Sequence, residues 1–580
     1  MHRSIHLRNF WKSDTRALHL RMVLRILAVS FGGLHTYAAI RSQSMNADGI
    51  SYLDIGDAYF QGDWVNAINP VWSPLYSWVL GFVNFVLKPS MAWEFPSVHI
   101  INFLIFVLAL ASFEFMWRNV RTTSEDLDTF SISEQMWWLL GYLLFIWTTL
   151  SLIQIWSVTP DMLMAVFVFL AAGLVAKIRV ADDQPRHFLY LGLVLGLGYL
   201  SKTFMFSTAL IFLMLAWIVQ KRIRTALWKA LLAVAMFLLI SLPYVALISN
   251  LKGRLTIGEA GTVTYVRHVL HIPYPHWQGD PEHNIVPTHL SRVIHQSPAI
   301  YEFGEPIHGT YAIGLDPSYW YEGISVPFQL KNLLIPLLPS GIYYLELFFQ
   351  KQGILLACVI VLYGLGYQKR RTIQDMLRQW VLVIPALAAF GLYALVLVED
   401  RYIGVFILLF WADVLANIRL SEMPGKSAWI RMISFVAAIG LAANILLFNL
   451  DGFARLNPSL VADLSDPAAP PARPLAVAQA LQRLGVHPGA KVGLIGYAYD
   501  AFWARLAKVR IVAEMLEDDA EALWHGDETL EQTVLNAFAD AGVRAVVAEN
   551  VPTHADLSNW HQVENSNYYI YVFPENEDFE

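Results

Sequence analysis

The sequence predicts an all-α polytopic membrane domain of about eleven transmembrane helices, followed by a small C-terminal α/β soluble domain. Three observations predict this fold class. Hydrophobic residues make up 56% of the 580-residue chain and charged residues only 15%, whereas soluble globular proteins carry about 25% charged residues. Apolar runs close to the length of a membrane span recur through the first 450 residues. The net charge then changes from +5 over residues 1–450 to −12 over residues 451–580.

Eleven segments qualify, or nearly qualify, as spans of roughly 20 mostly apolar residues. They are centred on Ile26–Ile40, Pro96–Trp117, Met136–Trp156, Met162–Ala176, His187–Leu200, Phe204–Gln220, Ala230–Ile248, Gly353–Tyr367, Trp380–Val398, Ile403–Asn417 and Ile433–Phe448. With a cytoplasmic N-terminus, 22 of the 32 bases in the first 450 residues lie inside and 10 outside. Because the outer segments are much longer, this bias follows the positive-inside rule. The odd number of spans puts the C-terminal domain on the extracytoplasmic side.

Two outer segments, residues 41–95 and 250–352, are too long to be simple connections within the 1–450 transmembrane domain. The first contains Pro74–Leu87, which is apolar but covers only about two-thirds of a span. Counting it as a span would invert every later loop and remove the charge bias. We therefore expect an interfacial helix there.

The tail changes from long apolar runs to short alternating elements. Residues 451–474 are expected to form a linker, which contains the Pro/Ala-rich run Asp466–Pro474. Residues 475–580 are expected to form the α/β domain. Its expected strands are Lys491–Tyr497, Val509–Ala513, Arg544–Ala548 and Tyr568–Phe573, and its expected helices are Asp500–Ala507 and Thr529–Ala541.

Ionisable residues gather at the expected outer ends of four spans. Asp48 follows the first span, Asp161 begins the fourth, Lys202 interrupts an apolar run, and Arg401 lies in a turn directly after Glu399 and Asp400. Charges at membrane depth are costly and usually mark function. Two carboxylates, a Lys and an Arg at one level can hold an anionic lipid head group and deprotonate an acceptor beside it.

Each of these residues alone has a simpler explanation. Asp48 suits a solvated loop, and Asp161 suits the first turn of a helix after Pro160. Lys202 suits a snorkelling turn residue, and Arg401 suits a local ion pair with a neighbouring carboxylate. The four together favour a site more strongly than any one of them.

The residues resemble motifs of the GT-C superfamily of polytopic glycosyltransferases, particularly relatives of protein O-mannosyltransferases and of the lipid A aminoarabinose transferase. The matching pieces are ADGISYLDIGDAYFQGDW around Asp48, SPLYSW at Ser73–Trp78, TPD at Thr159–Asp161, LSKT at Leu200–Thr203 and EDRY at Glu399–Tyr402. The chain departs from many relatives in having Asp48-Gly49 where they have an Asp-Glu pair. That departure puts a second adjacent carboxylate in doubt.

The resemblance implies that a sugar moves from a polyprenyl-phosphate donor to a lipid, glycan or protein acceptor on the outer membrane face, with inversion by direct displacement. Carried over by motif, the catalytic residues are Asp48 and Asp161, with Lys202, Arg401 and Tyr402 at the donor phosphate. We expect Tyr52, Glu399, Tyr265 and Trp320 to contact substrate. A divalent cation, Mg²⁺ or Mn²⁺, held by Asp48 and Asp161 is implied in some relatives. Cationic side chains beside the leaving phosphate would stabilise its negative charge. A carboxylate beside the acceptor hydroxyl could accept its proton.

Other carboxylates of the first outer segment are expected to be less important. Asp54 follows Asp48 by about 600° of helical turn, so it points away from it. Asp57 and Asp63 are expected to be solvated. Seven of the 17 histidines lie in residues 250–352, but their spacing matches no compact metal motif.

Two other function classes stay open. A non-catalytic lipid or polysaccharide transporter or flippase needs polar residues through the middle of its spans and an internal repeat, and neither is evident. A structural subunit whose outer domain recruits partners would tolerate loss of Asp48. Nucleic acid is not an expected partner, because the tail is acidic and no compact basic face is present. We expect the bacterial inner membrane, because the loops have no endoplasmic-reticulum retention signal and the tail has no cysteine.

Overall fold

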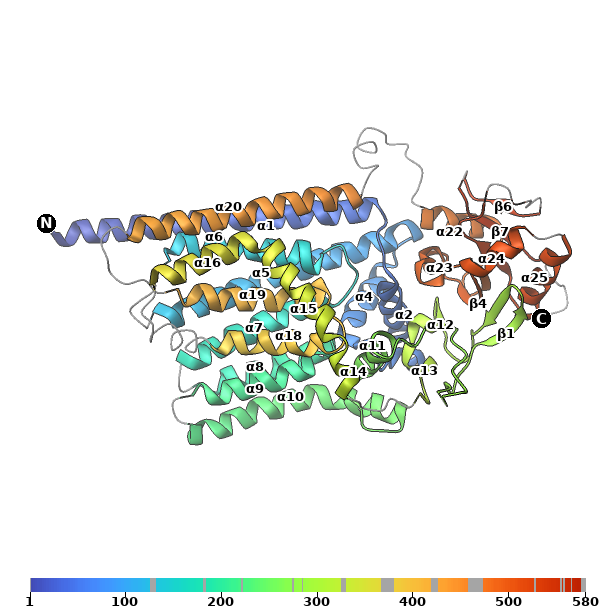
Figure 1. The fold of residues 1–580 in the computed structure, drawn as a ribbon, viewed down its shortest axis with the longest axis horizontal. Helices are drawn as coiled ribbons and strands as arrows, with labels where there is room; N and C mark the ends of the chain where they lie inside the picture. Colours follow the sequence, from blue (N-terminus) through green and yellow to red (C-terminus); the bar gives the residue numbers. More distant parts are fainter. Residues whose placement is uncertain are drawn as a thin grey trace.

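An elongated bundle of helices carries a mixed α/β region at one end, and the N-terminus lies at the opposite end of the bundle (Figure 1). The computed structural model describes residues 2–125, 132–180, 184–220, 223–273, 276–283, 285–324, 330–366, 380–418, 426–456, 473–525, 528–552, 555, 559–564 and 566–574. Most of the expected linker, including residues 457–472, lies outside these ranges.

Every segment expected to span the membrane is helical over most of its described residues. The helices are α1 (His2–Arg41), α5 (Glu94–Glu125), α6 (Glu134–Trp147) with η2 (Thr148–Ile153), α7 (Asp161–Val180), α8 (Pro185–Ser201), α9 (Met205–Ile218), α10 (Ile223–Lys252), α16 (Gly353–Gly366), α18 (Trp380–Ala394), α19 (Asp400–Ala416) and α20 (Lys426–Leu456). Within the described ranges, seven helical runs are long and apolar enough to cross a membrane, and α9, α16 and α18 are apolar but shorter. The protein is therefore an integral membrane protein with a helical membrane domain.

One of these seven runs was not expected. Leu330–Lys351, placed by the sequence in the second outer segment, has 22 residues with a mean hydropathy of 1.3. It consists of α14 (Leu330–Leu334), α15 (Leu337–Leu345) and the π-helical η3 (Glu346–Lys351). Lys331 and Glu346 interrupt the apolar pattern of this segment, and for that reason the sequence did not indicate a span there. α14, α15 and α16 follow one another from the side of the α/β region toward the opposite end of the bundle (Figure 1).

The first outer segment folds into short helices beneath the α/β region: α2 (Ala47–Gln61), α3 (Trp64–Ala67), α4 (Pro74–Leu87) and η1 (Met91–Trp93). The expected helix Pro74–Leu87 has the expected bounds. α2 and α4 approach at Gly56 and Gly81, where a Cβ on Gly56 would lie 2.7 Å from the carbonyl oxygen of Ser77. The two glycines thus allow backbone-to-backbone packing that fixes α2 on α4.

The α/β region contains a seven-stranded sheet in the order β1-β2-β4-β3-β5-β7-β6. Its strands are β1 (Arg292–Gln296), β2 (Ala299–Glu302), β3 (Lys491–Gly496), β4 (Arg510–Leu516), β5 (Ala545–Ala548), β6 (His561–Gln562) and β7 (Tyr569–Val572). β3 pairs in parallel with β4 and β5, and the other pairs are antiparallel. The four expected tail strands are confirmed as β3, β4, β5 and β7. The sequence prediction missed β6, and missed that the second outer segment supplies β1 and β2.

Helices of the tail cover this sheet. They are α22 (Arg473–Arg483), η4 (Ala498–Asp500), α23 (Phe502–Ala507), α24 (Glu517–Trp524) and α25 (Glu528–Asp540). The two expected tail helices correspond to η4 with α23 and to α25. The second outer segment also supplies α11 (Ala260–His268), α12 (Ala312–Leu315) and α13 (Pro317–Trp320).

Residues 310–314 of the second outer segment lie between α2 and the sheet. Ser51 of α2 donates from Oγ to the carbonyl oxygen of Gly314 at 3.0 Å. On the other side, the backbone N–H of Ile511 in β4 donates to the carbonyl oxygen of Thr310 at 2.9 Å. Tyr311 donates from its hydroxyl to Glu514 at 3.1 Å. Residues 310–314 therefore connect the sheet to the first outer segment through hydrogen bonds on both sides.

Candidate active site

The N-terminus of α2 places Asp48 against the turn that precedes α7. Asn46, the residue before α2, accepts from the backbone N–H of Val158 at 2.8 Å. Gly49 lies against the same turn, because an added Cβ would be 2.8 Å from the Val158 side chain. Asp48 lies in the first turn of α2, between these two contacts. The start of α2 is thus attached to the turn at Val158, which directly precedes Asp161 at the start of α7.

Arg401 joins the start of α19 to the start of α2. Its Nη1 donates to Asp48 Oδ2 at 2.9 Å, and its Nε donates to Glu399 Oε2 at 2.8 Å. Its Nη2 donates to the hydroxyl of Tyr402 at 3.3 Å. Asp400 faces elsewhere, because it accepts from Lys351 at 3.0 Å and from Tyr343. The local-pair explanation for Arg401 is therefore only half correct: it pairs with Glu399, but also with Asp48.

Lys202 pairs with Asp161 across the tops of α8 and α7. Lys202 is the residue after α8 and has an extended backbone, while Asp161 begins α7. Its Nζ donates to Asp161 Oδ1, and the side chain of Asp161 is only 1% exposed. A carboxylate buried this completely needs a cationic partner. The snorkelling explanation for Lys202 is therefore wrong.

The ring of Tyr402 connects the two ion pairs. Lys202 Nζ lies 3.9 Å from the ring centroid, and Arg401 Cζ lies 5.0 Å from it. Tyr402 stacks on Tyr393 of α18 with centroids 5.2 Å apart, and Tyr393 stacks on Phe204 at 4.1 Å. The aromatic stack holds the ring close to both cations. One continuous polar site is consequently formed by Asp48, Glu399, Arg401, Tyr402, Lys202 and Asp161.

Tyr52 lies one turn after Asp48 on α2. Its ring packs edge-on against Trp72 at 5.3 Å and Tyr76 at 5.2 Å. Burial, with the carboxylates of Asp48 and Asp161, raises the pKa of Tyr52 well above its usual value. The phenol therefore stays neutral and keeps a proton that it can donate.

The structure does not bring the other two expected substrate contacts to this site. Trp320 of α13 is buried, and its Nε1 donates to the carbonyl oxygen of Ala312 at 3.4 Å. Tyr265 lies on α11 with a buried hydroxyl. Within the described ranges, neither residue makes a hydrogen bond or ring contact with Asp48, Arg401 or Lys202. Their contact with substrate stays a prediction.

The divalent cation also stays a prediction. Among the described residues, no group of three or more His, Cys, Asp or Glu side chains is arranged to hold a metal ion. Asp48 and Asp161 each contact a cationic side chain instead. These residues do not form a ready cation site on their own.

The tail contributes a residue that the sequence reasoning missed. Tyr499 of η4 packs edge-on against Tyr311 with centroids 5.1 Å apart. Burial raises the pKa of Tyr499 well above its usual value, Arg267 of α11 lowers it, and the carboxylates of Glu514 and Asp48 raise it further. At this point the tail therefore packs against the second outer segment. The aromatic run Tyr497-Ala-Tyr499 directly after a strand was the available signal.

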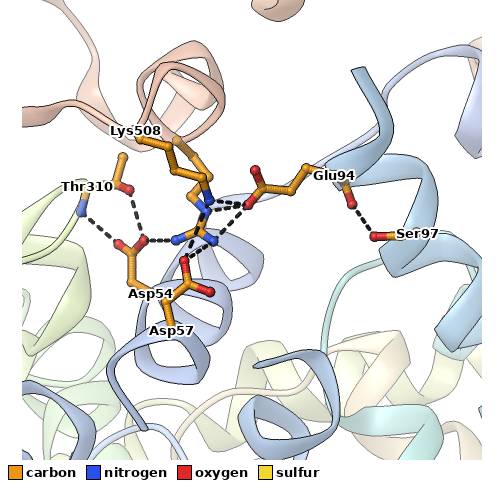
Figure 2. Close-up of polar contacts among 7 residues, drawn as sticks. Asp54, Asp57, Glu94, Ser97, Thr310 and Lys508 are labelled. Carbon is orange, nitrogen blue, oxygen red and sulfur yellow. Dashed lines mark hydrogen bonds and ion pairs between the residues drawn. The ribbon is translucent and has the colours of Figure 1, made fainter. Parts of the chain in front are cut away.

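Asp54, expected to point away from Asp48, and Asp57, expected to be solvated, both contact a basic residue of the tail. Arg505 of α23 donates to Asp54 Oδ1 and to Asp57 Oδ2, both at 2.6 Å. Burial raises the pKa of Asp54. For Asp57, the charges of Arg505 and Lys508 outweigh burial and hold the pKa below its usual value. Figure 2 shows both carboxylates directed toward the basic groups of the tail.

Asp63, which was also expected to be solvated, caps α3. It accepts a hydrogen bond from the backbone N–H of Asn66 at 3.3 Å.

Charged groups that are buried or partly buried also occur away from this site. Glu114, in the second half of α5, accepts from Arg25 of α1 and from Tyr142 of α6. Asp413, in the last turn of α19, is 2% exposed and accepts from Asn417 at 3.3 Å. The charges of the membrane domain are therefore not confined to the end of the bundle that carries Asp48.

The structure resembles two solved proteins. ArnT from Cupriavidus metallidurans in the apo state is 13% identical over 94% of this chain and 97% of that chain, with a TM-score of 0.49. The same protein bound to undecaprenyl phosphate has the same identity and coverage, with a TM-score of 0.48. An Archaeoglobus fulgidus oligosaccharyltransferase tethered with an acceptor peptide is 11% identical over 91% of this chain and 69% of that chain, with a TM-score of 0.40.

No family model and no curated protein matches the sequence.

Proposed function

We propose that this protein is a membrane glycosyltransferase that moves a sugar from a polyprenyl-phosphate donor to an acceptor at the end of the bundle that carries α2. The observation that supports this most is the convergence of two ion pairs, Arg401 with Asp48 and Lys202 with Asp161, around the ring of Tyr402. Two cations and two carboxylates from four separate segments meet at this end of the bundle. This arrangement suits a phosphate held beside a proton acceptor.

In the proposed reaction, an acceptor hydroxyl attacks the anomeric carbon of the sugar. The new carbon–oxygen bond forms as the bond from that carbon to the phosphate oxygen breaks, and the bonding electrons remain on the phosphate. The hydroxyl proton passes to Asp48, whose carboxylate is 30% exposed and therefore reachable. Attack opposite to the leaving group inverts the anomeric carbon.

Arg401 and Lys202 stabilise the negative charge that develops on the leaving phosphate. The guanidinium of Arg401 is oriented by Glu399 and by the Tyr402 hydroxyl, so it is already aligned when the donor arrives. Asp161 holds Lys202 from the buried side of the site. The neutral phenol of Tyr52 can donate to an oxygen of the sugar or of the phosphate.

The membrane placement is also part of the proposal. We place the N-terminus in the cytoplasm and the α/β region, with the site, on the extracytoplasmic face of a bacterial inner membrane. A lipid-linked donor can then enter from the bilayer while a lipid, glycan or protein acceptor approaches beneath the α/β region.

The test uses the full-length protein in lipid nanodiscs. Undecaprenyl phosphate, which ArnT from Cupriavidus metallidurans binds, is the binding probe. Transfer is followed by mass spectrometry as release of polyprenyl phosphate from synthetic polyprenyl-phosphate hexoses and pentoses, supplied with membrane lipid and glycan extracts as acceptors. We expect saturable binding and acceptor-dependent release, with binding retained and release lost in Asp48→Asn.

Two results would contradict the proposal. Undecaprenyl phosphate binding that is absent, or that Arg401→Ala leaves unchanged, would place the phosphate elsewhere. Binding together with movement of the intact donor across the bilayer, without cleavage, would favour a flippase instead.

A further inference from the structure

A buried charge network connects the tail to α2. Arg505 of α23 is 3% exposed and donates to three carboxylates from two segments. Asp54 and Asp57 lie on α2, and Glu94 begins α5, where Arg505 Nε reaches it at 2.7 Å. Lys508 adds a second cation, 2.8 Å from Glu94 and 3.5 Å from Asp57.

Every nitrogen of the Arg505 guanidinium has a carboxylate partner, with an oxygen within 2.7 Å. Asp54 also accepts from the backbone N–H and from the hydroxyl of Thr310, at 2.7 and 2.9 Å. Figure 2 shows Asp54, Asp57 and Glu94 converging from α2 and α5 below the tail, with Thr310 beside them. A planar fork used in this way fixes direction as well as distance.

The same helix carries the proposed base. Asp54 follows Asp48 by six residues, which corresponds to roughly 9 Å along α2 at 1.5 Å per residue. α2 has only 15 residues, from Ala47 to Gln61. A tilt or shift at Asp54 and Asp57 is therefore transmitted to Asp48, and a displacement of about 1 Å can reduce a rate about 100-fold.

We propose that Arg505 is a positioning residue, which holds α2 in the orientation that places Asp48 beside Arg401 and the acceptor. The inference rests on the proposed function in treating Asp48 as the base. It gives the tail a part in catalysis, because α2 is held in three places. These are the packing on α4, the contact with the turn at Val158 and the ion pairs with Arg505 of α23. The network belongs to the tail and the first outer segment and does not contact the donor phosphate site.

The test separates positioning from simple stabilisation. Arg505→Met alone leaves three carboxylates without their buried cation and is expected to impair folding. The informative variant therefore neutralises Arg505 and its three carboxylates together: Asp54→Asn, Asp57→Asn, Glu94→Gln and Arg505→Met. It leaves no uncompensated buried carboxylate in the network, and the remaining cation, Lys508, is 41% exposed and can be solvated. A second variant, Arg505→Lys, keeps the charge and loses the fork.

Two readouts are measured in nanodiscs. Hydrogen exchange of α2 reports its attachment without any need for activity, and steady-state transfer gives kcat and the donor KM. In both variants we expect faster exchange of α2, by about tenfold, and a kcat lower by about 10-fold to 100-fold with the donor KM within about twofold. The matched control is Arg483→Met, because Arg483 is a 63% exposed arginine of the same region that pairs with Glu564.

The outcomes are decisive for the inference. Unchanged α2 exchange in the neutral-network variant or in Arg505→Lys overturns it, and so does faster exchange with an unchanged kcat. If the neutral-network variant does not fold, Arg505→Lys decides by the same two criteria. If the wild-type protein transfers no sugar, the proposed function fails, while the exchange of α2 still shows whether Arg505 holds this helix.

Discussion

Arg401 and Asp48 lie 353 positions apart in the chain and meet through a hydrogen bond of 2.9 Å. The contact joins the start of α19 to the start of α2, so the membrane bundle and the first outer segment share one polar site. Because Arg401 also binds Glu399, its guanidinium is paired with two carboxylates, which hold it in the site. Any anionic ligand that enters must approach beside a carboxylate, which is the juxtaposition that sugar transfer from a phosphate requires.

The first prediction concerns Asp48→Asn. The amide keeps the size and the hydrogen-bonding capacity of the side chain but cannot accept a proton, so we expect transfer to fall by about 10²–10⁴-fold. Binding of undecaprenyl phosphate should persist. The matched control is Asp63→Asn, because Asp63 lies on the same outer segment and only caps α3. Near-normal transfer by a correctly inserted Asp48→Asn protein would remove Asp48 as the base and leave Asp161 as the next candidate.

The helices and the ionisable ends of the spans could be predicted from the sequence because both are local signals. A run of apolar residues specifies a helix in lipid by itself. The partner of a charge is not local: Arg505 lies 451 positions from Asp54, and no pattern in the sequence connects them. For the same reason Asp57 reads as solvated in the sequence, although Arg505 binds it in the fold.

Membership of the sheet was predicted only for strands of the tail. β3, β4 and β5 are apolar runs in the tail separated by helices, which is the local signature of parallel pairing. β1 is largely exposed and polar, and it lies in a different part of the chain. Its place beside β2 follows from the docking of the second outer segment on β4, which is a tertiary contact.

The second prediction concerns the cations. Arg401→Ala should weaken binding of undecaprenyl phosphate by about tenfold to 150-fold, because a charge-assisted hydrogen bond contributes about 1.5–3 kcal/mol. Arg401→Lys should recover only part of this, since an ammonium cannot reproduce the fork. Binding is measured in nanodiscs, with Arg292→Ala as the control because Arg292 is 67% exposed and pairs with Glu302. Equal affinities for the Ala variant and the wild type would move the phosphate away from Arg401.

Lys202 needs a different substitution. Removing it alone would leave Asp161, which is 1% exposed, without its cation and would destabilise the fold. The double variant Lys202→Met with Asp161→Asn removes both charges together. We expect it to insert and fold, and to bind undecaprenyl phosphate at least tenfold more weakly, because the second cation of the site is lost. Wild-type affinity in this variant would exclude Lys202 from the phosphate site.

The third prediction tests the packing of α2 on α4. Gly56→Ala places a methyl group 2.7 Å from the carbonyl oxygen of Ser77, which the backbone of α4 can relieve only by moving. Overpacking of this kind costs about 1–3 kcal/mol, and we expect lower thermal stability together with slower transfer. Gly261→Ala is the matched control, because nothing lies within 4 Å of its added Cβ. A Gly56→Ala protein as stable and active as the wild type would show that α2 does not depend on this contact.

The fourth prediction concerns membrane orientation. In a Cys358→Ala background, single cysteines replace Arg186 at the start of α8 and Asp518 of α24, both of which are exposed. The partition of bases predicts that an impermeant reagent applied to intact cells labels position 518 and not position 186. Disruption of the membrane should then make position 186 reactive, which controls for its accessibility. Labelling of position 186 from outside would overturn the orientation and the extracytoplasmic site with it.

The fifth prediction concerns Glu549 in the tail. This carboxyl follows β5, accepts from Trp503 Nε1 at 2.9 Å, and has its pKa raised by burial to about 7. Because the folded state holds this proton more tightly than the unfolded state, the stabilisation is complete below the unfolded pKa and is lost as the pH rises toward 7. Thermal unfolding in nanodiscs should therefore show a melting temperature that falls between pH 5 and pH 8. Glu549→Gln, which can still accept from Trp503 and does not ionise, should flatten this fall and be the more stable protein at pH 8. A Gln variant with the wild-type pH profile would show that another group governs it.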